Sequence, residues 1–283
     1  MLLGVDFKAK YGDRFYKMLA SNLTHNGFTY KIGENIDHNE FNPSGSCTKG
    51  GLYFTTLNNL LKFVMYGQYI GLIEISDDAY VYVEEDKFKA NKVTLMKIVD
   101  QEVDILELLQ LSYENGCSLP VDMCEYAARC DYLEILKWAR AHECPWGVRT
   151  CIYAAMNGHL ETLKWAIANG CSWDEWTCAY AAENGHLEIL KWARDNGCPW
   201  NEMTCAYAAK NGQLETLKWA RMNGCPWDEM TCAYAARNGH LETLEWAICN
   251  GYPWNKFTCR YAAESGNLET LKWAIEHGYT SDT

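Results

Sequence analysis

Cysteines are the residues of this chain whose spacing comes nearest to a chemical motif. Pairs of cysteines seven residues apart return at a fixed interval, among them Cys144/Cys151, Cys171/Cys178, Cys198/Cys205 and Cys225/Cys232. A zinc site needs four ligands in tetrahedral arrangement, but each pattern offers two thiols and no histidine at a nearby repeated position. Tyr252 replaces one cysteine in a later copy without loss of the surrounding motif. We therefore expect small buried side chains and no metal.

Histidine also recurs, as His159, His186 and His240, but Gln213 and Asn267 take the same position in other copies. Hydrogen bonding at a turn tolerates all three side-chain types, so this row does not indicate catalysis. A lysine row is matched by glutamates three residues earlier, which predicts solvated ion pairs along helices. Its members are Lys137, Lys164, Lys191, Lys218 and Lys272, paired with Glu134, Glu161, Glu188, Glu215 and Glu269.

These residues recur because the C-terminal half repeats one 27-residue unit six times, with copies starting at Cys124, Cys151, Cys178, Cys205, Cys232 and Cys259. A fixed period of this size indicates a stacked array, which offers a surface for binding. Asp174 is a good N-cap for a first helix that ends at Gly185. A second helix is expected over His186–Asn196. Helices of about 11 residues are not stable alone, so neighbouring repeats must stabilise them.

Charge narrows the partners that the chain can bind. Residues 101–283 contain 14 basic and 25 acidic side chains, which is most of the net charge of −12. An acidic array repels phosphate backbones, so we expect no nucleic acid and no anionic membrane, and a basic protein is favoured. The N-terminus has no signal-peptide pattern, and no apolar run is long enough to span a membrane. The chain is therefore expected to stay unsecreted, with free thiols.

The segment TCAYAAENGHLEILKWARDNG resembles an ankyrin repeat, with Thr177, Ala181, Ala182, Gly185 and Asn196 in the ankyrin order. The resemblance covers residues 97–283, of which the first copy is degenerate. It implies a mainly α fold, an ankyrin-like helix-pair solenoid. Ankyrin repeats are about 33 residues long, and the missing residues fall where the family has its β-hairpin finger. We therefore expect an array that is almost wholly helical.

Two tryptophan rows can be interpreted through this resemblance. The first row is Trp138, Trp165, Trp192, Trp219, Trp246 and Trp273, and the second is Trp146, Trp173, Trp200, Trp227 and Trp254. The first row takes the position of a core leucine in ankyrin repeats, so we expect it in the core. The second row precedes each first helix, where tryptophan can pack onto that helix as a staple. Binding of a sugar or peptide by either row is the alternative.

Residues 1–96 are expected to form a small α+β domain. Helices are predicted over 11–22 and 57–66, and strands over 28–32, 52–55, 69–75 and 79–84. The segment 92–99 is predicted to be a further strand or the lead into the array. The loop 42–51 is expected to be the most flexible part. The segments 41–56 and 77–95 resemble the domain that precedes ankyrin arrays in giant DNA viruses of amoebae. This resemblance implies a viral protein in the host cytoplasm or the virion.

A non-catalytic protein-protein interaction scaffold or adaptor is the favoured function. Positions that differ between near-identical copies are free to contact a partner, and these lie on the first helix, which lines the concave face of ankyrin-like stacks. The candidate binding residues are Arg129, Met156, Glu183, Lys210, Arg237 and Glu264 at one position, and Trp176, Met203 and Met230 at another. Drift on a neutral surface is the alternative. We expect a monomer without a cofactor.

A second hypothesis places an enzyme in the N-terminal domain. His25-Asn26-Gly27 and the segment 50–55 faintly resemble the histidine and glycine-aromatic segments of ADP-ribosyltransferases. The resemblance implies an NAD-dependent activity that the array would target. The catalytic glutamate of that family has no assignable counterpart here.

Overall fold

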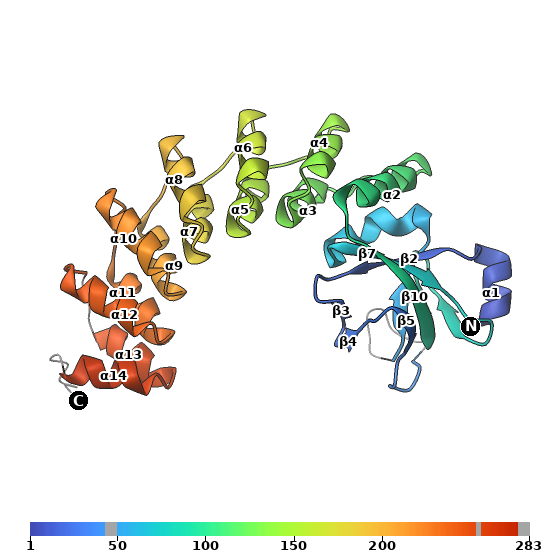
Figure 1. Cartoon of the computed structure of the whole chain (residues 1–283), viewed down its shortest axis with the longest axis horizontal. Helices are drawn as coiled ribbons and strands as arrows, with labels where there is room; N and C mark the ends of the chain where they lie inside the picture. Colours follow the sequence, from blue (N-terminus) through green and yellow to red (C-terminus); the bar gives the residue numbers. More distant parts are fainter. Residues whose placement is uncertain (43–49, 253–255, 277–283) are drawn as a thin grey trace. The chain divides into compact units, whose positions relative to one another are not determined.

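The computed structural model describes residues 1–42, 50–252 and 256–276, and it divides into two compact units, Met1–Pro145 and Trp146–Thr283 (Figure 1). The first unit contains the strand-rich domain together with three helices that follow it. The predicted boundary between residues 96 and 97 falls inside strand β10 (Lys92–Val99).

Two four-stranded antiparallel sheets form the N-terminal domain, in the orders β1-β8-β9-β6 and β2-β7-β10-β5, with a small β3-β4 hairpin beside them. The remaining elements are β1 (Leu2–Leu3), α1 (Gly4–Tyr11), β2 (Phe15–Leu19), β3 (Thr24–His25), β4 (Phe28–Thr29), β5 (Gly33–Ile36), β6 (Leu52–Phe54), the 3₁₀-helix η1 (Leu57–Tyr66), β7 (Tyr69–Glu74), β8 (Tyr80–Val83) and β9 (Phe88–Ala90).

One hydrophobic core joins the two sheets, with side chains from each and Phe7 of α1 among them. The Phe7 ring lies 5.0 Å from the Phe15 ring and 4.8 Å from the Phe88 ring, measured between centroids. Aromatic pairs at these separations add to the free energy of burial. The core therefore fixes β2 and β6, two strands that line a pocket described below, and β9, which follows the pocket residue Lys87.

The predicted strands at 52–55, 69–75 and 79–84 are confirmed as β6, β7 and β8, and the segment 92–99 is the strand β10. The predicted helix over 11–22 is wrong, because β2 occupies its centre and pairs with β7. Lys17 lies in the middle of this strand with its side chain buried, and its Nζ donates to the Tyr53 carbonyl at 2.8 Å. The predicted loop at 42–51 lies mostly outside the described residues.

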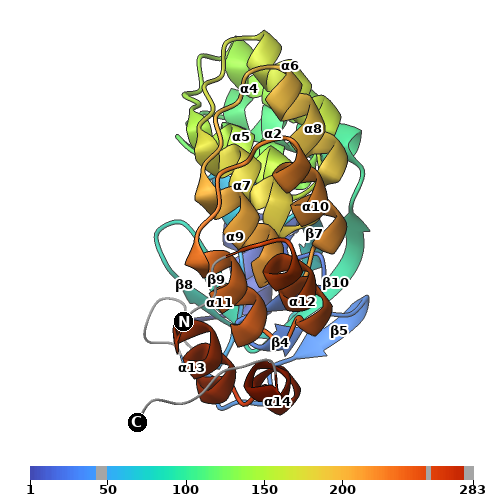
Figure 2. The ribbon, with the colours of Figure 1, turned by 90° about the vertical axis from the view of Figure 1, so that its left-hand side faces the viewer.

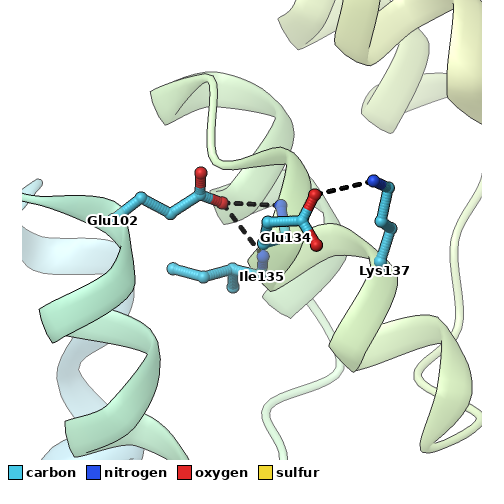
Figure 3. Close-up of polar contacts among 4 residues, drawn as sticks. All are labelled: Glu102, Glu134, Ile135 and Lys137. Carbon is cyan, nitrogen blue, oxygen red and sulfur yellow. Dashed lines mark hydrogen bonds and ion pairs between the residues drawn. The ribbon is translucent and has the colours of Figure 1, made fainter.

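The helices α2 (Glu102–Glu114), α3 (Met123–Cys130) and α4 (Leu133–Ala141) complete the first unit. The degenerate first copy packs against η1, as expected for a terminal repeat. Glu102 of α2 accepts from the backbone N–H groups of Glu134, at 2.7 Å, and Ile135, at 3.1 Å (Figure 3). The carboxylate thereby caps α4, whose own N-cap residue makes no capping bond.

The second unit is a double row of helices, each about two and a half turns long. The first helices of the repeats are α5 (Val148–Met156), α7 (Glu175–Glu183), α9 (Glu202–Lys210), α11 (Glu229–Arg237) and α13 (Lys256–Glu264). The second helices are α6 (Leu160–Ala168), α8 (Leu187–Asp195), α10 (Leu214–Met222), α12 (Leu241–Cys249) and α14 (Leu268–Glu276). Figure 2 shows the two rows side by side. No described residue after Val99 lies in a strand, so the prediction of a helical array without hairpins is confirmed.

Each repeat is held by caps within it and by contacts with the next. The Asp174 carboxylate accepts from the Trp176 N–H at the start of α7, as predicted. Gly185 follows α7 with φ +72°, and a Cβ there would collide with the Gln213 side chain of the following repeat. Ala179 and Ala182 are fully buried, which lets neighbouring first helices approach closely. None of the described helices is long and apolar enough to cross a membrane.

Candidate protein-binding face

The first helices present one continuous stripe of side chains. Trp176, Tyr180 and Glu183 are spaced i, i+4 and i+7 on α7, which places them on one face of the helix. Later first helices repeat this arrangement at the same positions of the unit, so the stripes of successive helices lie next to one another. The face is therefore built by the repeat itself.

An aromatic strip runs across this face, formed by Trp176, Tyr180, Tyr207 and Tyr234. Ring centroids are 5.8 Å apart for Trp176 and Tyr207, and 5.7 Å apart for Tyr180 and Tyr207. The Tyr207 and Tyr234 rings are separated by 6.3 Å. All four residues are half-buried, so each ring packs on its neighbours and keeps part of its surface exposed. Amphipathic aromatic side chains of this kind are enriched in protein interfaces.

Charged side chains flank the strip at its C-terminal border. Lys210 Nζ lies 2.6 Å from Glu183 Oε1, so the two variable positions of neighbouring repeats pair with each other. Arg237 is exposed, and its guanidinium lies 5.8 Å from the Tyr261 ring centre. Glu264 pairs with Arg260 within the same helix. The border is therefore largely neutralised, with Arg237 as an exposed cation.

The N-terminal border of the face is acidic, with Asp174, Glu175, Glu202, Asp228 and Glu229 at the starts of three first helices. Burial raises the pKa of Asp228, and the nearby Glu229 and Glu202 carboxylates also raise it. The backbone hydrogen bonds from Met230 and Thr231 to this carboxylate lower the pKa by less than these effects together raise it. Carboxylates at helix starts also interact favourably with the helix dipole. This border attracts cationic groups.

The remaining predicted residues are placed as follows. Met156, Met203 and Met230 are half-buried on α5, α9 and α11. Arg129 belongs to the first compact unit, where its Nη2 donates to the Met65 carbonyl at 3.2 Å. At the second position of the repeat, directly after its first cysteine, Ala179, Ala206 and Ala233 are buried between helices, whereas Arg260 is exposed and pairs with Glu264.

The tyrosines of the strip escaped the sequence analysis because they are identical in every copy. Variation between copies was the criterion for a partner-facing position, and an invariant tyrosine looks like a core residue. The signal that could have revealed them is spacing, since each tyrosine lies four residues after the variable Trp176, Met203 or Met230.

The tryptophan rows pack against each other on the other side of the repeat. Rings of the two rows meet at 5.8 Å for Trp146 and Trp165, and at 5.7 Å for Trp173 and Trp192. The first row was predicted to lie in the core, and its members Trp165, Trp192 and Trp219 are half-buried. The second-row rings of Trp146 and Trp173 contact second helices through these pairs, and their predicted packing onto the first helix stays a prediction. The Arg194 guanidinium covers Trp200 at 4.1 Å.

The cysteines that contact each other are not the ones that lie seven residues apart in the sequence. Cys178 and Cys198, twenty residues apart, hydrogen-bond through their thiols, and that bond with burial raises the pKa of Cys198. The Cys198 thiol also donates to the Asp174 carbonyl at 3.4 Å, and the same contact recurs in other repeats. Burial raises the pKa of Cys232 to about 12. The Cys198 and Cys232 thiols are neutral at physiological pH and act as buried side chains, as predicted, whereas a hydrogen bond with Cys124 lowers the pKa of Cys144 to about 7.

The solvated lysine row is confirmed for four members. Nζ–Oε1 distances are 2.6 Å for Lys137 and Glu134, and 2.8 Å for both Lys164 with Glu161 and Lys191 with Glu188. Lys218 pairs with Glu215 in the same way. His186, from the histidine row, has its Nε2 3.1 Å from the Met156 carbonyl of the preceding repeat. Among the described residues, no three His, Cys, Asp or Glu side chains gather as a metal site.

The N-terminal domain contains a separate pocket. His25 and Tyr53, which carry the second hypothesis, are brought together with ring centroids 6.4 Å apart. The lining residues are Tyr16, Lys17, Met18, His25, Tyr53, Phe54, Thr55, Phe63, Tyr66 and Lys87. No glutamate is among these described residues, so the pocket supplies no candidate for the catalytic glutamate.

Comparisons with known proteins agree with the repeat architecture. A family model described as ankyrin repeats (many copies) matches residues 151–193, 178–221 and 232–275. Ankyrin repeat proteins R868 and R229 of Acanthamoeba polyphaga mimivirus are 33% identical over 88 residues and 36% identical over 76 residues. These alignments cover 29% and 24% of this chain. They span 44% and 25% of the relatives, so the chain matches less than half of either.

A solved structure also matches, the ankyrin repeat domain of human ASB11. The match has a TM-score of 0.46 and 16% sequence identity, and it covers 56% of this chain and 85% of that domain.

Proposed function

Because residues 151–221 and 232–275 are ankyrin repeats, we propose that this chain is a non-catalytic adaptor that holds a protein on the first-helix face of its array. Ankyrin repeats are modules for protein-protein interaction, and stacked repeats offer one extended surface. The observation that carries the choice of face is the aromatic strip of Trp176, Tyr180, Tyr207 and Tyr234. Its rings pack on one another and retain exposed surface.

The partner that fits this face is basic. Carboxylates at the N-terminal border favour lysine and arginine, while the aromatic strip supplies faces over which such cations bind. The strip also accepts the apolar stems of those side chains. Electrostatic complementarity of this kind speeds association and weakens as salt rises.

The viral context of the proposal rests on the mimivirus relatives. A protein with these relatives acts in the cytoplasm of an infected cell or within the virion, and its partner is a host or viral protein. We expect the adaptor to be a monomer, since one array presents the whole face.

The test compares variants of the full chain in quantitative capture from lysates of infected amoebae, followed by affinity measurement with the purified captured protein. Trp176→Ala/Tyr207→Ala/Tyr234→Ala should weaken capture at least tenfold, because buried aromatic residues carry much of the free energy of such interfaces. Glu175→Gln/Glu202→Gln/Glu229→Gln should reduce the salt dependence of binding and leave the helices intact.

The matched control is Lys164→Ala/Lys191→Ala/Lys218→Ala, which removes three solvated side chains from the second helices. This variant should bind as the unmodified chain does. If it loses the partner while the aromatic variant retains it, the binding face has been assigned to the wrong side of the array.

A further inference from the structure

The pocket of the N-terminal domain combines positive charge with aromatic walls. Its cavity volume is about 60 Å³, and the pocket is open to solvent on one side. Strands β2 and β6 supply its floor, η1 supplies Phe63 and Tyr66, and Lys87 precedes β9. The elements that line it are fixed by the core described above, so the pocket is part of the folded domain.

Three lysines lie around Tyr53, and two of them, Lys17 and Lys87, line the pocket. Lys17 Nζ donates to the Tyr53 carbonyl, and the ammonium groups of Lys87 and Lys89 lie 5.0 and 5.1 Å from the Tyr53 ring centre. Lys17 is 4% exposed and Lys89 is fully buried. The Glu84 carboxylate, 3.6 Å from Lys87 Nζ, offsets part of this charge. Cations held in a partly desolvated cleft create a strong local field for an anion.

Aromatic side chains form the remaining walls. Tyr16 and Tyr53 are buried in the floor, while Phe63 and Tyr66 lie with ring centroids 6.2 Å apart at the 3₁₀-helix. Tyr66 is 59% exposed, which is unusual for a large ring beside a pocket. A ligand with a planar ring would cover this exposed surface by stacking.

We propose that this open pocket receives the phosphate group of a small aromatic phosphate at Lys17 and Lys87, while the ring of that ligand stacks on Phe63 and the exposed Tyr66. Lysine ammonium groups are good phosphate ligands because they act as compact point charges. The inference is independent of the proposed adaptor function, which belongs to the array. It assigns the N-terminal domain a ligand and no reaction.

A neutral histidine in the pocket supports this arrangement and supplies a readout. Burial and, to a smaller extent, the Lys17 and Lys87 cations together lower the pKa of His25 to about 4. A bound phosphate would offset those cations. The pKa of His25 should therefore rise when the ligand binds, and NMR of the His25 ring can follow that rise.

The experiment uses the full chain with AMP, and with adenosine and inorganic phosphate as separate controls. Thermal shift and calorimetry should give AMP a dissociation constant at least tenfold below that of either control. Lys87→Gln should weaken AMP binding about tenfold. Lys62→Gln is the matched control, because Lys62 is exposed on η1 and pairs with Asp86 outside the pocket lining; it should leave binding unchanged.

Several results would overturn the proposal. Equal binding of inorganic phosphate would show that the ring makes no contribution, and equal binding of adenosine would show the same for the phosphate. Absence of AMP binding at millimolar concentration, or an equal loss in Lys62→Gln, would also contradict it. A response to NAD without any response to AMP would favour the ADP-ribosyltransferase hypothesis.

Discussion

Replacing Trp192 by alanine tests whether the tryptophan rows hold the array together. The Trp192 ring belongs to α8 and lies 5.7 Å from the Trp173 ring at an interplanar angle of 62°. A tryptophan buries about 150–250 Å² in a protein, and truncation of this half-buried ring exposes or vacates roughly 120 Å². At about 25 cal/mol per Å² of apolar surface, Trp192→Ala should lower the free energy of unfolding by about 3 kcal/mol. The Trp173 contact adds roughly 0.5–1.5 kcal/mol.

The assay is equilibrium unfolding in urea, followed by far-UV circular dichroism. Because each repeat is stabilised only by its neighbours, weakening one repeat inside the array should split the transition into two. Leu190→Ala on the same helix should cost roughly 3–5 kcal/mol, since Leu190 is fully buried. Lys191→Ala is the control and should change stability by under about 0.5 kcal/mol, because its ion pair with Glu188 is solvated.

A double-mutant cycle with Trp173→Ala isolates the contact between the rings, with an expected coupling of about 0.5–1.5 kcal/mol. A loss under about 1 kcal/mol for Trp192→Ala, with a single unshifted transition, would refute the reasoning. It would place the first tryptophan row on a surface free to bind ligands.

Two further predictions concern the first compact unit. Glu102→Gln should lower the free energy of unfolding of this unit by about 1 kcal/mol, because the N–H groups of Glu134 and Ile135 lose a charged acceptor at the start of α4. Glu107→Gln on the same helix as Glu102 is the control, and urea unfolding measures both variants. Lowering the pH from 7 to 5 should reduce the free energy of unfolding by about 1–2 kcal/mol through His25. The pKa of His25 is lowered to about 4 in the folded state, so as the pH falls the unfolded state binds the proton first and the folded state becomes less stable. His25→Gln should remove that part of the pH dependence, and an unchanged profile in the variant would contradict the assignment.

Sequence periodicity predicted the array well because its physical causes are local. The caps at Asp174 and Gly185 and the alanines between first helices act within a repeat or between immediate neighbours. The N-terminal domain was less predictable because its elements depend on distant pairing. The strand β2 contains Lys17, whose burial depends on a carbonyl 36 residues away. No pattern in the residues around Lys17 predicts that the Tyr53 carbonyl is its hydrogen-bond partner.

Contacts between repeats were equally hard to predict, because the sequence of a single repeat does not show which residues of the next repeat it meets. Two cysteines seven residues apart, such as Cys171 and Cys178, look like a pair in the sequence but belong to successive repeats. The thiol that hydrogen-bonds with Cys178 is that of Cys198, twenty residues away in the same repeat. Variable residues looked free to meet a partner, yet Glu183 and Lys210 pair with each other from adjacent repeats. For Glu183 and Lys210 the stacking of repeats, which no single copy specifies, decides the partner.

The tyrosines of the aromatic strip show why identity between copies is ambiguous in a repeat protein. A residue can be identical in every copy because the core requires it, as for Ala182, which is fully buried. It can also be identical because one long ligand is contacted at every step. Tyr180, Tyr207 and Tyr234 are only half-buried, and the Tyr207 ring contacts both Tyr180 and Tyr234 in the neighbouring repeats.

Packing accounts for an aromatic ring at these three positions, but phenylalanine would pack as well. The hydroxyl on each ring requires a different reason, and hydrogen bonds to a partner's backbone are the one that the proposed face provides. Tyr180→Phe/Tyr207→Phe/Tyr234→Phe should therefore retain stability within about 0.5 kcal/mol and weaken capture of the partner. Urea unfolding measures the first quantity and quantitative capture the second. Unchanged capture would leave the strip as packing alone.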